Sequence, residues 1–211
     1  MWEFMQKGGP IMWAILLCSV AAFAIVVERL ISLRREQIDT KAFMEQIANA
    51  MKRNRVMEAL DLCDRTSGPI ATILKAGILK HDRSKAEVRE AIEDSSVHEV
   101  PRLEKNLPIL ATIAHITPLL GLLGTVTGMV AAFQVIESKA TSLNPVNPGD
   151  LAGGIWTALL TTMAGLCVAI PTLVAYNYFV SRVDGFVLEM ERSATDLMNI
   201  LGEKRDSYEV S

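Results

Sequence analysis

The chain has 211 residues, of which 50% are hydrophobic and 21% are charged. Its 21 Lys and Arg residues against 24 Asp and Glu residues leave a net charge of -3, which lacks the basic excess that binding of nucleic-acid phosphates requires. The charges fall in blocks between long apolar runs, and this pattern indicates membrane spans. Cys18, Cys63 and Cys167 have neither zinc-site spacing nor an even disulfide count, so we interpret them as reduced packing residues.

The first apolar run, residues 8–27, contains no charged residue. At about 20 residues it is just long enough to cross a bilayer as a helix. A cleaved signal peptide is the alternative, because Ala22-Phe23-Ala24 resembles a cleavage site. Signal peptides carry basic residues before the apolar core, whereas here only Lys7 precedes it and Arg29 follows it. We therefore predict that residues 1–27 are an external N-terminus and a retained first transmembrane helix.

Two further runs, residues 106–136 and 151–181, contain no Asp, Glu, Lys or Arg. Each has about 30 residues, so each helix should tilt or project beyond the membrane. The segment 137–150 between them contains Asn-Pro and Asn-Pro-Gly, whose turn-forming chemistry predicts a short exposed loop. Residues 106–181 are thus predicted to form a transmembrane hairpin.

Lys and Arg residues near the span ends predict the orientation, because cytoplasmic flanks are enriched in them. They follow span one, precede span two and follow span three, whereas the opposite side has only Lys7 and Lys139. We predict a periplasmic N-terminus, a cytoplasmic segment at 28–105 and a cytoplasmic C-terminal helix or tail at 182–211. The fold class is therefore all-α integral membrane, with three transmembrane helices and long cytoplasmic helical extensions.

The segment 28–105 mixes acids and bases and has few helix breakers, Gly68-Pro69 and Pro101 being the clearest. Ser84 and Glu87 have the spacing of a capping box, which predicts a helix that starts there and runs toward span two. Apolar residues at helical spacing predict amphipathic helices that pack on one another. These residues are Met44, Ile47, Ala48 and Met51, followed by Met57 and Leu60 with Asp61 and Leu62.

Titratable residues in the same segment suggest a metal or acid/base cluster, but their spacing does not support one. They contain no His-Glu-x-x-His arrangement, and the chain has no nucleotide-binding glycine loop, nucleophile elbow or paired catalytic carboxylate. We predict neither a metal site nor an enzyme. The residues concerned are His81, Asp82, Glu93, Asp94, His98 and Glu99.

Each span of the hairpin has one face of small and weakly polar residues, which lets another helix approach the backbone closely. Simple helix packing explains the glycines, and contact with the helix of a partner protein is the functional alternative. The faces consist of Thr117, Gly121, Gly124, Thr125, Gly128 and Ala132 in span two, and of Gly154, Ala158, Thr161, Thr162, Gly165 and Ala169 in span three, with Thr157 at the margin. We assign partner-helix contact to Thr117, Gly121, Gly124, Gly128, Ala158 and Gly165.

The threonines admit two interpretations. A membrane threonine usually bonds its hydroxyl to its own helix, but several on facing stripes favour a polar conduit for an ion or a water chain. A proton pathway usually needs a titratable carboxylate, which neither span has, and His115 projects from the opposite side of span two. If these helices conduct ions, the acid must come from a partner chain.

Two segments resemble a known family. Residues 117–129, Thr-Pro-Leu-Leu-Gly-Leu-Leu-Gly-Thr-Val-Thr-Gly-Met, are similar to the second-span motif of the ExbB/TolQ/MotA family. Residues 154–162, followed by Gly165, Ala169-Ile170-Pro171 and Tyr176-Asn177, resemble its third-span motif. MotA-type stators have four spans, so the three-span layout is closer to the ExbB/TolQ branch.

The resemblance implies a pentamer of this subunit around the single-span helices of two ExbD/TolR-like partners, which carry the membrane Asp. It implies that ion flow across the bacterial inner membrane drives these partners and delivers force for envelope transport or maintenance. No cofactor is expected, and the transported ion is H⁺ by family prevalence.

By position, Thr125 and Thr162 match polar pathway residues of that family, whereas Thr157 stands where ExbB and TolQ proteins commonly have Glu. We predict an ion pathway of Thr125, Thr157, Thr161 and Thr162, whose oxygens also suit Na⁺ as an alternative ion. A stand-alone channel, a structural scaffold and a membrane-anchored enzyme remain as other functions.

Overall fold

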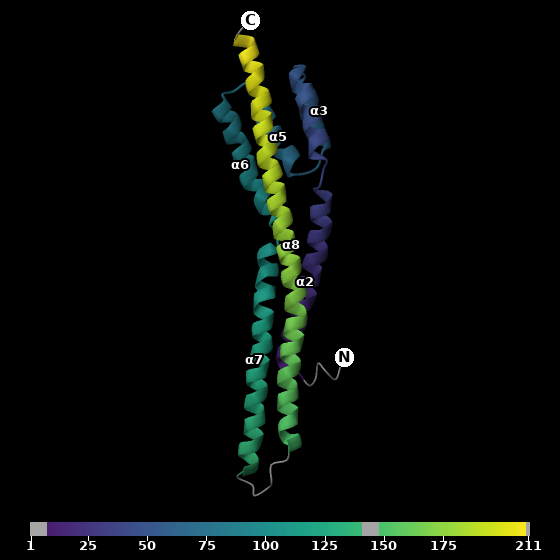
Figure 1. The fold of residues 1–211 in the computed structure, drawn as a ribbon, viewed down its shortest axis with the longest axis vertical. Coiled ribbons are helices and arrows are strands. Elements are labelled where there is room, and N and C mark those ends of the chain that lie inside the picture. Colours follow the sequence, from purple (N-terminus) through teal and green to yellow (C-terminus); the bar gives the residue numbers. More distant parts are fainter. Residues whose placement is uncertain (1–7, 141–147, 210–211) are drawn as a thin grey trace. The chain divides into compact units, whose positions relative to one another are not determined.

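The computed structural model describes residues 8–140 and 148–209, with the side chains of the last helix described as far as Gly202. These residues form seven helices and their connections (Figure 1). The helices are α2 (Gly9–Arg35), α3 (Thr40–Lys52), α4 (Val56–Arg65), α5 (Pro69–Leu79), α6 (Lys85–Leu103), α7 (Leu107–Ala140) and α8 (Pro148–Glu209).

The chain divides into two compact units, and α2 and α8 each continue from one into the other. The membrane unit comprises residues 1–28 and 106–178, and the helical unit comprises 29–105 and 179–211. The described residues include three helices that are long and apolar enough to cross a membrane. The predicted all-α fold is therefore confirmed, and it contains three helices that are long and apolar enough to be the predicted spans.

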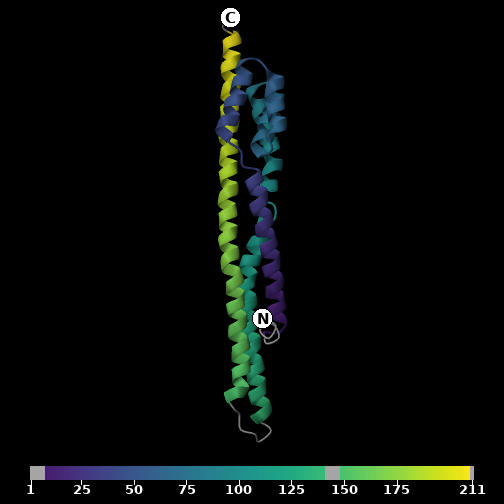
Figure 2. The same cartoon turned by 90° about the vertical axis from the view of Figure 1, so that its right-hand side faces the viewer.

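In the membrane unit, α2 runs beside the α7–α8 hairpin (Figures 1 and 2). Its inner face buries Met12, Ile15 and Ala22. Its outer face leaves Leu17 and Phe23 71% and 72% exposed, and outward apolar side chains of this kind suit contact with lipid.

The connection within the hairpin is shorter than the predicted loop at 137–150. Helix α7 continues to Ala140, since Glu137 to Lys139 include no helix breaker, and α8 begins at Pro148. Proline favours the first helical turn because its fixed φ suits a helix and its missing N–H is not needed there. The predicted Asn144-Pro145 turn lies outside the described residues.

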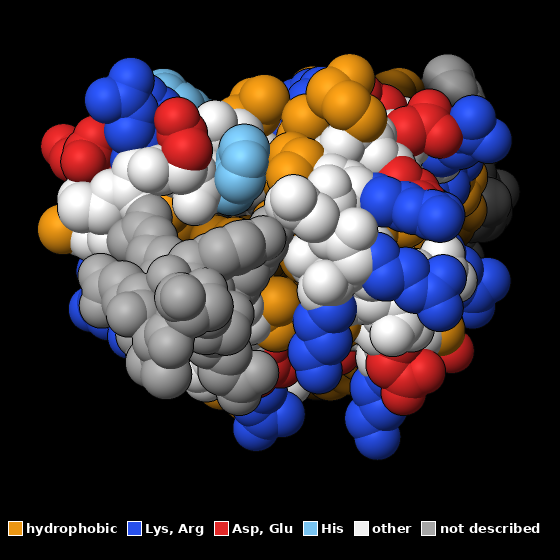
Figure 3. All heavy atoms as spheres, turned by 90° about the horizontal axis from the view of Figure 1, so that it is seen from above, with side chains coloured by type: hydrophobic (Ala, Val, Ile, Leu, Met, Phe, Trp, Pro, Cys, Tyr) orange, Lys and Arg blue, Asp and Glu red, His pale blue; other side chains and the backbone are white. Residues whose placement is uncertain are grey.

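The helical unit confirms two local predictions. Gly68, at φ 131°, separates α4 from α5, and Pro69 occupies the first turn of α5. Ser84 Oγ accepts from the Glu87 N–H at 3.2 Å, and Glu87 Oε1 accepts from the Ser84 N–H at 3.3 Å, so the capping box starts α6. Hydrogen bonds from Ser84 lower the pKa of the Glu87 carboxyl. Figure 3, a view from above, shows basic and acidic side chains interspersed on the exposed surface.

The packing faces of α3 and α4 differ in part from the prediction. Ile47 and Met51 are buried as expected, but Phe43 accompanies them, whereas Met44 is only half-buried. Met57 is 78% exposed because it lies in the first turn of α4, on the face turned away from the core. The residues that α4 buries are Ala59 and Cys63, and Ala50 takes the place predicted for Ala48 in α3.

As a helix breaker, Pro101 was expected to end a helix. It lies inside α6 instead. The break comes at Asn106, which has a left-handed φ of 64°. Arg29, only 2% exposed, donates from Nη1 to the Leu103 carbonyl at 3.2 Å, and Asn106 donates to Glu28 Oε2 at 2.9 Å. Glu28 and Arg29 are adjacent in α2, and they form hydrogen bonds with residues at the break and just before it, Asn106 and Leu103.

Replacing Arg29 with Met should lower the free energy of unfolding by about 1–3 kcal/mol, because it leaves a buried carbonyl without its donor. Thermal unfolding in detergent would measure the change. Arg34→Met is the control, since Arg34 is exposed on the same helix. An equal loss of stability in both variants would contradict this role of Arg29.

Cys63 is a buried thiol in the helical unit. Burial, assisted by the charge of Asp64 and opposed by that of Lys75, raises its pKa from 9.0 to about 11. The thiol therefore stays protonated in the folded chain at pH values where an unfolded thiol ionises.

In a Cys18→Ser, Cys167→Ser background, alkylation of Cys63 at pH 8 should be about 100-fold slower in the folded chain than after unfolding. Stability should also fall between pH 9 and pH 11, since only the unfolded thiol then releases its proton. Mass spectrometry of iodoacetamide-treated protein would follow the reaction. Equal rates in both states would show that Cys63 is not protected.

Candidate functional site

Helices α7 and α8 approach each other closely at Gly121. A Cβ built there would lie 3.0 Å from the Thr162 Cα and 3.1 Å from the Thr161 carbonyl oxygen. The Thr162 hydroxyl donates to the Gly121 carbonyl at 3.1 Å, which is a hydrogen bond between the two helices. Only a residue without a side chain permits this backbone approach.

One turn further along α7, the Thr161 side chain occupies the space beside Gly124. A Cβ on Gly124 would overlap Thr161 Oγ1. Thr161 is 0% exposed, and its hydroxyl donates to the carbonyls of Ala158 at 2.9 Å and Thr157 at 3.1 Å. Thr161 therefore packs inside the hairpin, where an ion outside cannot reach it.

The same packing continues toward both ends of the hairpin. A Cβ on Gly128 would meet the Gly154 carbonyl at 2.8 Å and the Ala158 Cβ at 3.1 Å, and one on Gly165 would meet the Thr117 carbonyl at 2.7 Å. Thr117 is 0% exposed and bonds its hydroxyl to its own helix.

The six residues assigned to partner-helix contact thus all lie between α7 and α8 of one chain, in the contact between the two helices that we call the seam. A partner helix would contact them only if the hairpin opened. Helix packing explains their positions in the closed hairpin, and a partner would have to approach from another side.

Three of the four predicted pathway threonines remain partly accessible. Thr125, Thr157 and Thr162 are half-buried, and the first two donate to carbonyls of their own helices, Leu122 at 2.6 Å and Gly153 at 3.0 Å. A hydroxyl that donates still has lone pairs for a cation or for water. These three oxygens therefore have the chemistry of a polar pathway, although they cannot titrate near neutral pH.

The sequence pattern placed Gly154 on the small-residue face of span three but did not assign it to a contact. Gly154 lies against α7, because a Cβ there would be 2.7 Å from the Ala132 Cβ, and its spacing from Ala158 was the available signal. His115 is exposed, with Nδ1 2.7 Å from the Ala111 carbonyl oxygen.

Two apolar helices packed together at glycines, with a third apolar helix in the same unit, form the architecture of a multi-pass membrane protein. The model of the MotA/TolQ/ExbB proton channel family matches residues 65–192, more than half of the chain. The chain belongs to this family.

The individual relatives are named as ExbB and TolQ proteins, which places the chain in the ExbB/TolQ branch of the family. The chain is 28% identical to a putative biopolymer transport protein ExbB homolog of Methanothermobacter thermautotrophicus over 190 residues, 90% of this chain but only 66% of that relative. It is 30% identical to the Tol-Pal system protein TolQ of Haemophilus influenzae over 180 residues, 79% of this chain and 76% of the relative. A putative ExbB-like protein of Synechocystis is 31% identical over 85% of this chain and 70% of its own length.

Two adjacent glycines test the packing of the hairpin. Gly154→Ala should lower the free energy of unfolding by about 1–3 kcal/mol, because the new methyl group would meet Ala132 and the Gly128 carbonyl. Gly153→Ala is the matched control, since a Cβ there meets nothing within 4 Å. Thermal unfolding of both variants in detergent would compare them, and equal stability would contradict the seam described here.

Proposed function

We propose that this chain is the ring-forming subunit of an ion-driven motor in the cytoplasmic membrane, acting with a single-span ExbD/TolR-like partner that carries a membrane Asp. One observation carries the proposal: the two spans of the hairpin, residues 106–136 and 151–181, present threonine hydroxyls but contain no acid. The N-terminus would face the periplasm and the C-terminus the cytoplasm, as the Lys and Arg distribution predicts.

Proton transfer through an apolar region requires a group that gains and loses a proton in the relevant pH range. Threonine hydroxyls cannot do this, but their oxygens can solvate an ion as it approaches a carboxylate. A partner Asp placed against the hairpin would supply the missing group. Of the predicted pathway residues, the half-buried Thr125, Thr157 and Thr162 are those that such an acid can approach without opening the seam.

The relatives support a role in energising the cell envelope. Their names include biopolymer transport and the Tol-Pal system. A pentameric ring around two partner helices would give each Asp successive, identical hairpins as the partner turns. The ion gradient would then do work on the partner, which transmits force across the envelope.

Thr157 bears on the choice of ion. Where related subunits commonly have Glu, this chain offers a neutral hydroxyl, so the partner Asp would be the only membrane acid in the pathway. Hard oxygen ligands from Thr125, Thr157 and Thr162 are also compatible with Na⁺, and H⁺ is the ion that the family description names.

Purification of the tagged chain from its own cells should bring down a single-span protein with a membrane Asp. Reconstituted together in liposomes with a pH-sensitive dye, the two should admit protons down an imposed gradient, and replacing the partner's Asp with Asn should stop the flux. A sodium-sensitive dye at fixed pH would identify Na⁺ as the ion instead. Equal flux of either ion without the partner would refute the borrowed-acid mechanism and favour a stand-alone channel.

Combined replacement of Thr125 and Thr157 with Val should reduce this flux about tenfold or more, because each loss removes a hydroxyl that solvates the ion. Thr112→Val is the control, since that exposed threonine of α7 lies outside the motif and donates to the Pro108 carbonyl of its own helix. Co-purification of the partner would show that assembly is intact. Unchanged flux in the double variant would favour a scaffold role for the hairpin.

A further inference from the structure

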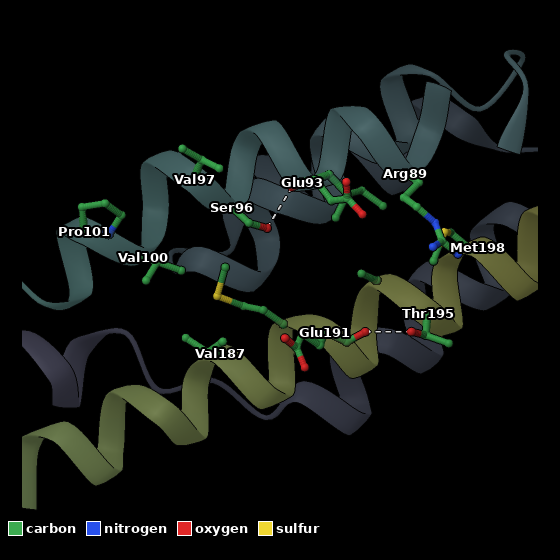
Figure 4. A pocket seen from close by; sticks show the side chains of 13 residues that line it. Arg89, Glu93, Ser96, Val97, Val100, Pro101, Val187, Glu191, Thr195 and Met198 are labelled. Atoms are coloured by element: carbon green, nitrogen blue, oxygen red, sulfur yellow. Dashed lines mark hydrogen bonds between the residues drawn. The ribbon is translucent and has the colours of Figure 1, made fainter. Parts of the chain in front are cut away.

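In the helical unit, α6 and α8 border a groove of about 760 Å³ (Figure 4). Ile92 and Met190, both buried, form its floor, and Val100 and Val187 line its sides. Val97, a large apolar side chain on the rim, is 67% exposed. The groove extends from Arg89 to Pro101, about 18 Å or three helical turns, which suits a helix.

The polar groups of the groove have a distinct arrangement. Ser96 and Thr195 turn their hydroxyls to carbonyls of their own helices, at 2.8 Å and 2.9 Å, and so leave the interior apolar (Figure 4). Glu93 on α6 and Glu191 on α8 are exposed, and neither carboxylate forms a hydrogen bond or ion pair with the described part of the chain. The groove therefore offers an apolar floor between two available negative charges, with the basic Arg89 at one end.

A face of α8 outside the groove has complementary properties. Gly185, Leu188 and Arg192 share this face at helical spacing. Leu188 is 47% exposed, a Cβ on Gly185 would meet nothing within 4 Å, and the exposed Arg192 has no ion pair among the described residues. The face thus combines open space for close approach, an apolar side chain and a positive charge.

Membrane insertion also aligns this face with the groove. Copies that insert in one orientation around an axis along the membrane normal keep identical residues at the same height. Residues 187–198 of α8 line the groove, so residues 188 and 192 of a neighbouring copy lie at its level. In such an arrangement Leu188 would meet Val97 and Val187, and Arg192 would lie level with Glu191.

We propose that the α6–α8 groove of one copy receives the Gly185–Leu188–Arg192 face of α8 from a second copy, with Arg192 between Glu93 and Glu191. Because the two surfaces differ, each copy can offer both, and the contact repeats until a ring closes. The inference rests on the proposed function only in requiring several copies in one membrane orientation.

Disulfide cross-linking tests the contact in a chain whose three native cysteines are replaced by Ala. Oxidation of Val97→Cys, Leu188→Cys protein in membranes should give a ladder of covalent multimers beyond the dimer. The matched control is Met57→Cys, Leu188→Cys, since Met57 is equally available at 78% exposure but lies outside the groove. No ladder from the first pair, or an equal ladder from the control, would overturn the proposal.

Charge reversal provides the second test. Glu93→Arg alone and Arg192→Glu alone should each reduce the assembled fraction, measured by native mass spectrometry, at least about twofold, and the two together should recover assembly. Glu90→Arg, an exposed acid of α6 outside the groove, should leave assembly unchanged. Single variants that assemble normally would contradict the contact.

The outcomes separate this inference from the proposed function. Intact assembly with proton flux but no groove cross-link would overturn the interface and leave the motor standing. Cross-linked rings without proton flux would support the interface and count against the motor function. A different protein or a lipid captured at Val97→Cys in place of a second copy would identify another occupant and refute the proposal.

Discussion

The close approach of α7 and α8 is the constraint on which the membrane unit depends. Lipid offers no hydrophobic advantage to helix association, so the hairpin must gain its stability from van der Waals contact and hydrogen bonds. Gly121 lets the Thr162 hydroxyl reach a backbone carbonyl of the other helix, and Gly124 makes room for Thr161. The small residues therefore do more than leave space, because they bring polar and apolar atoms of the two helices into contact.

This packing determines which threonines are available for chemistry. Thr161 and Thr162 are adjacent, but one is buried in the seam and the other is half-buried at its edge. Thr125 follows Gly124 by one residue, a rotation of about 100° about the helix axis, and so also lies at the edge. The small residues hold the hairpin together, and the accessible hydroxyls lie along its margin.

The sequence predicted the spans, the capping box at Ser84 and the turn at Gly68, because each depends on local chemistry or on a long uniform run. It was less successful where a choice between neighbouring positions depends on contacts distant in the chain. Periodicity placed Thr161 and Thr162 on one broad face but could not say which of them faces Gly124. In the short helix α4, a few apolar residues fit more than one face, so Met57 was wrongly assigned to the core.

The groove between α6 and α8 is a second feature that the sequence alone does not predict. Its residues lie about a hundred positions apart in the chain, and in sequence Glu93 and Glu191 are ordinary solvated acids. Only the fold sets them on opposite sides of an apolar floor. Glu189, two residues from Glu191, accepts from Thr40 Oγ1 at 2.9 Å and is satisfied within the chain. The Glu191 carboxylate, unlike that of Glu189, has no partner within the described part of the chain, so in the proposed contact charge as well as shape would select the second surface.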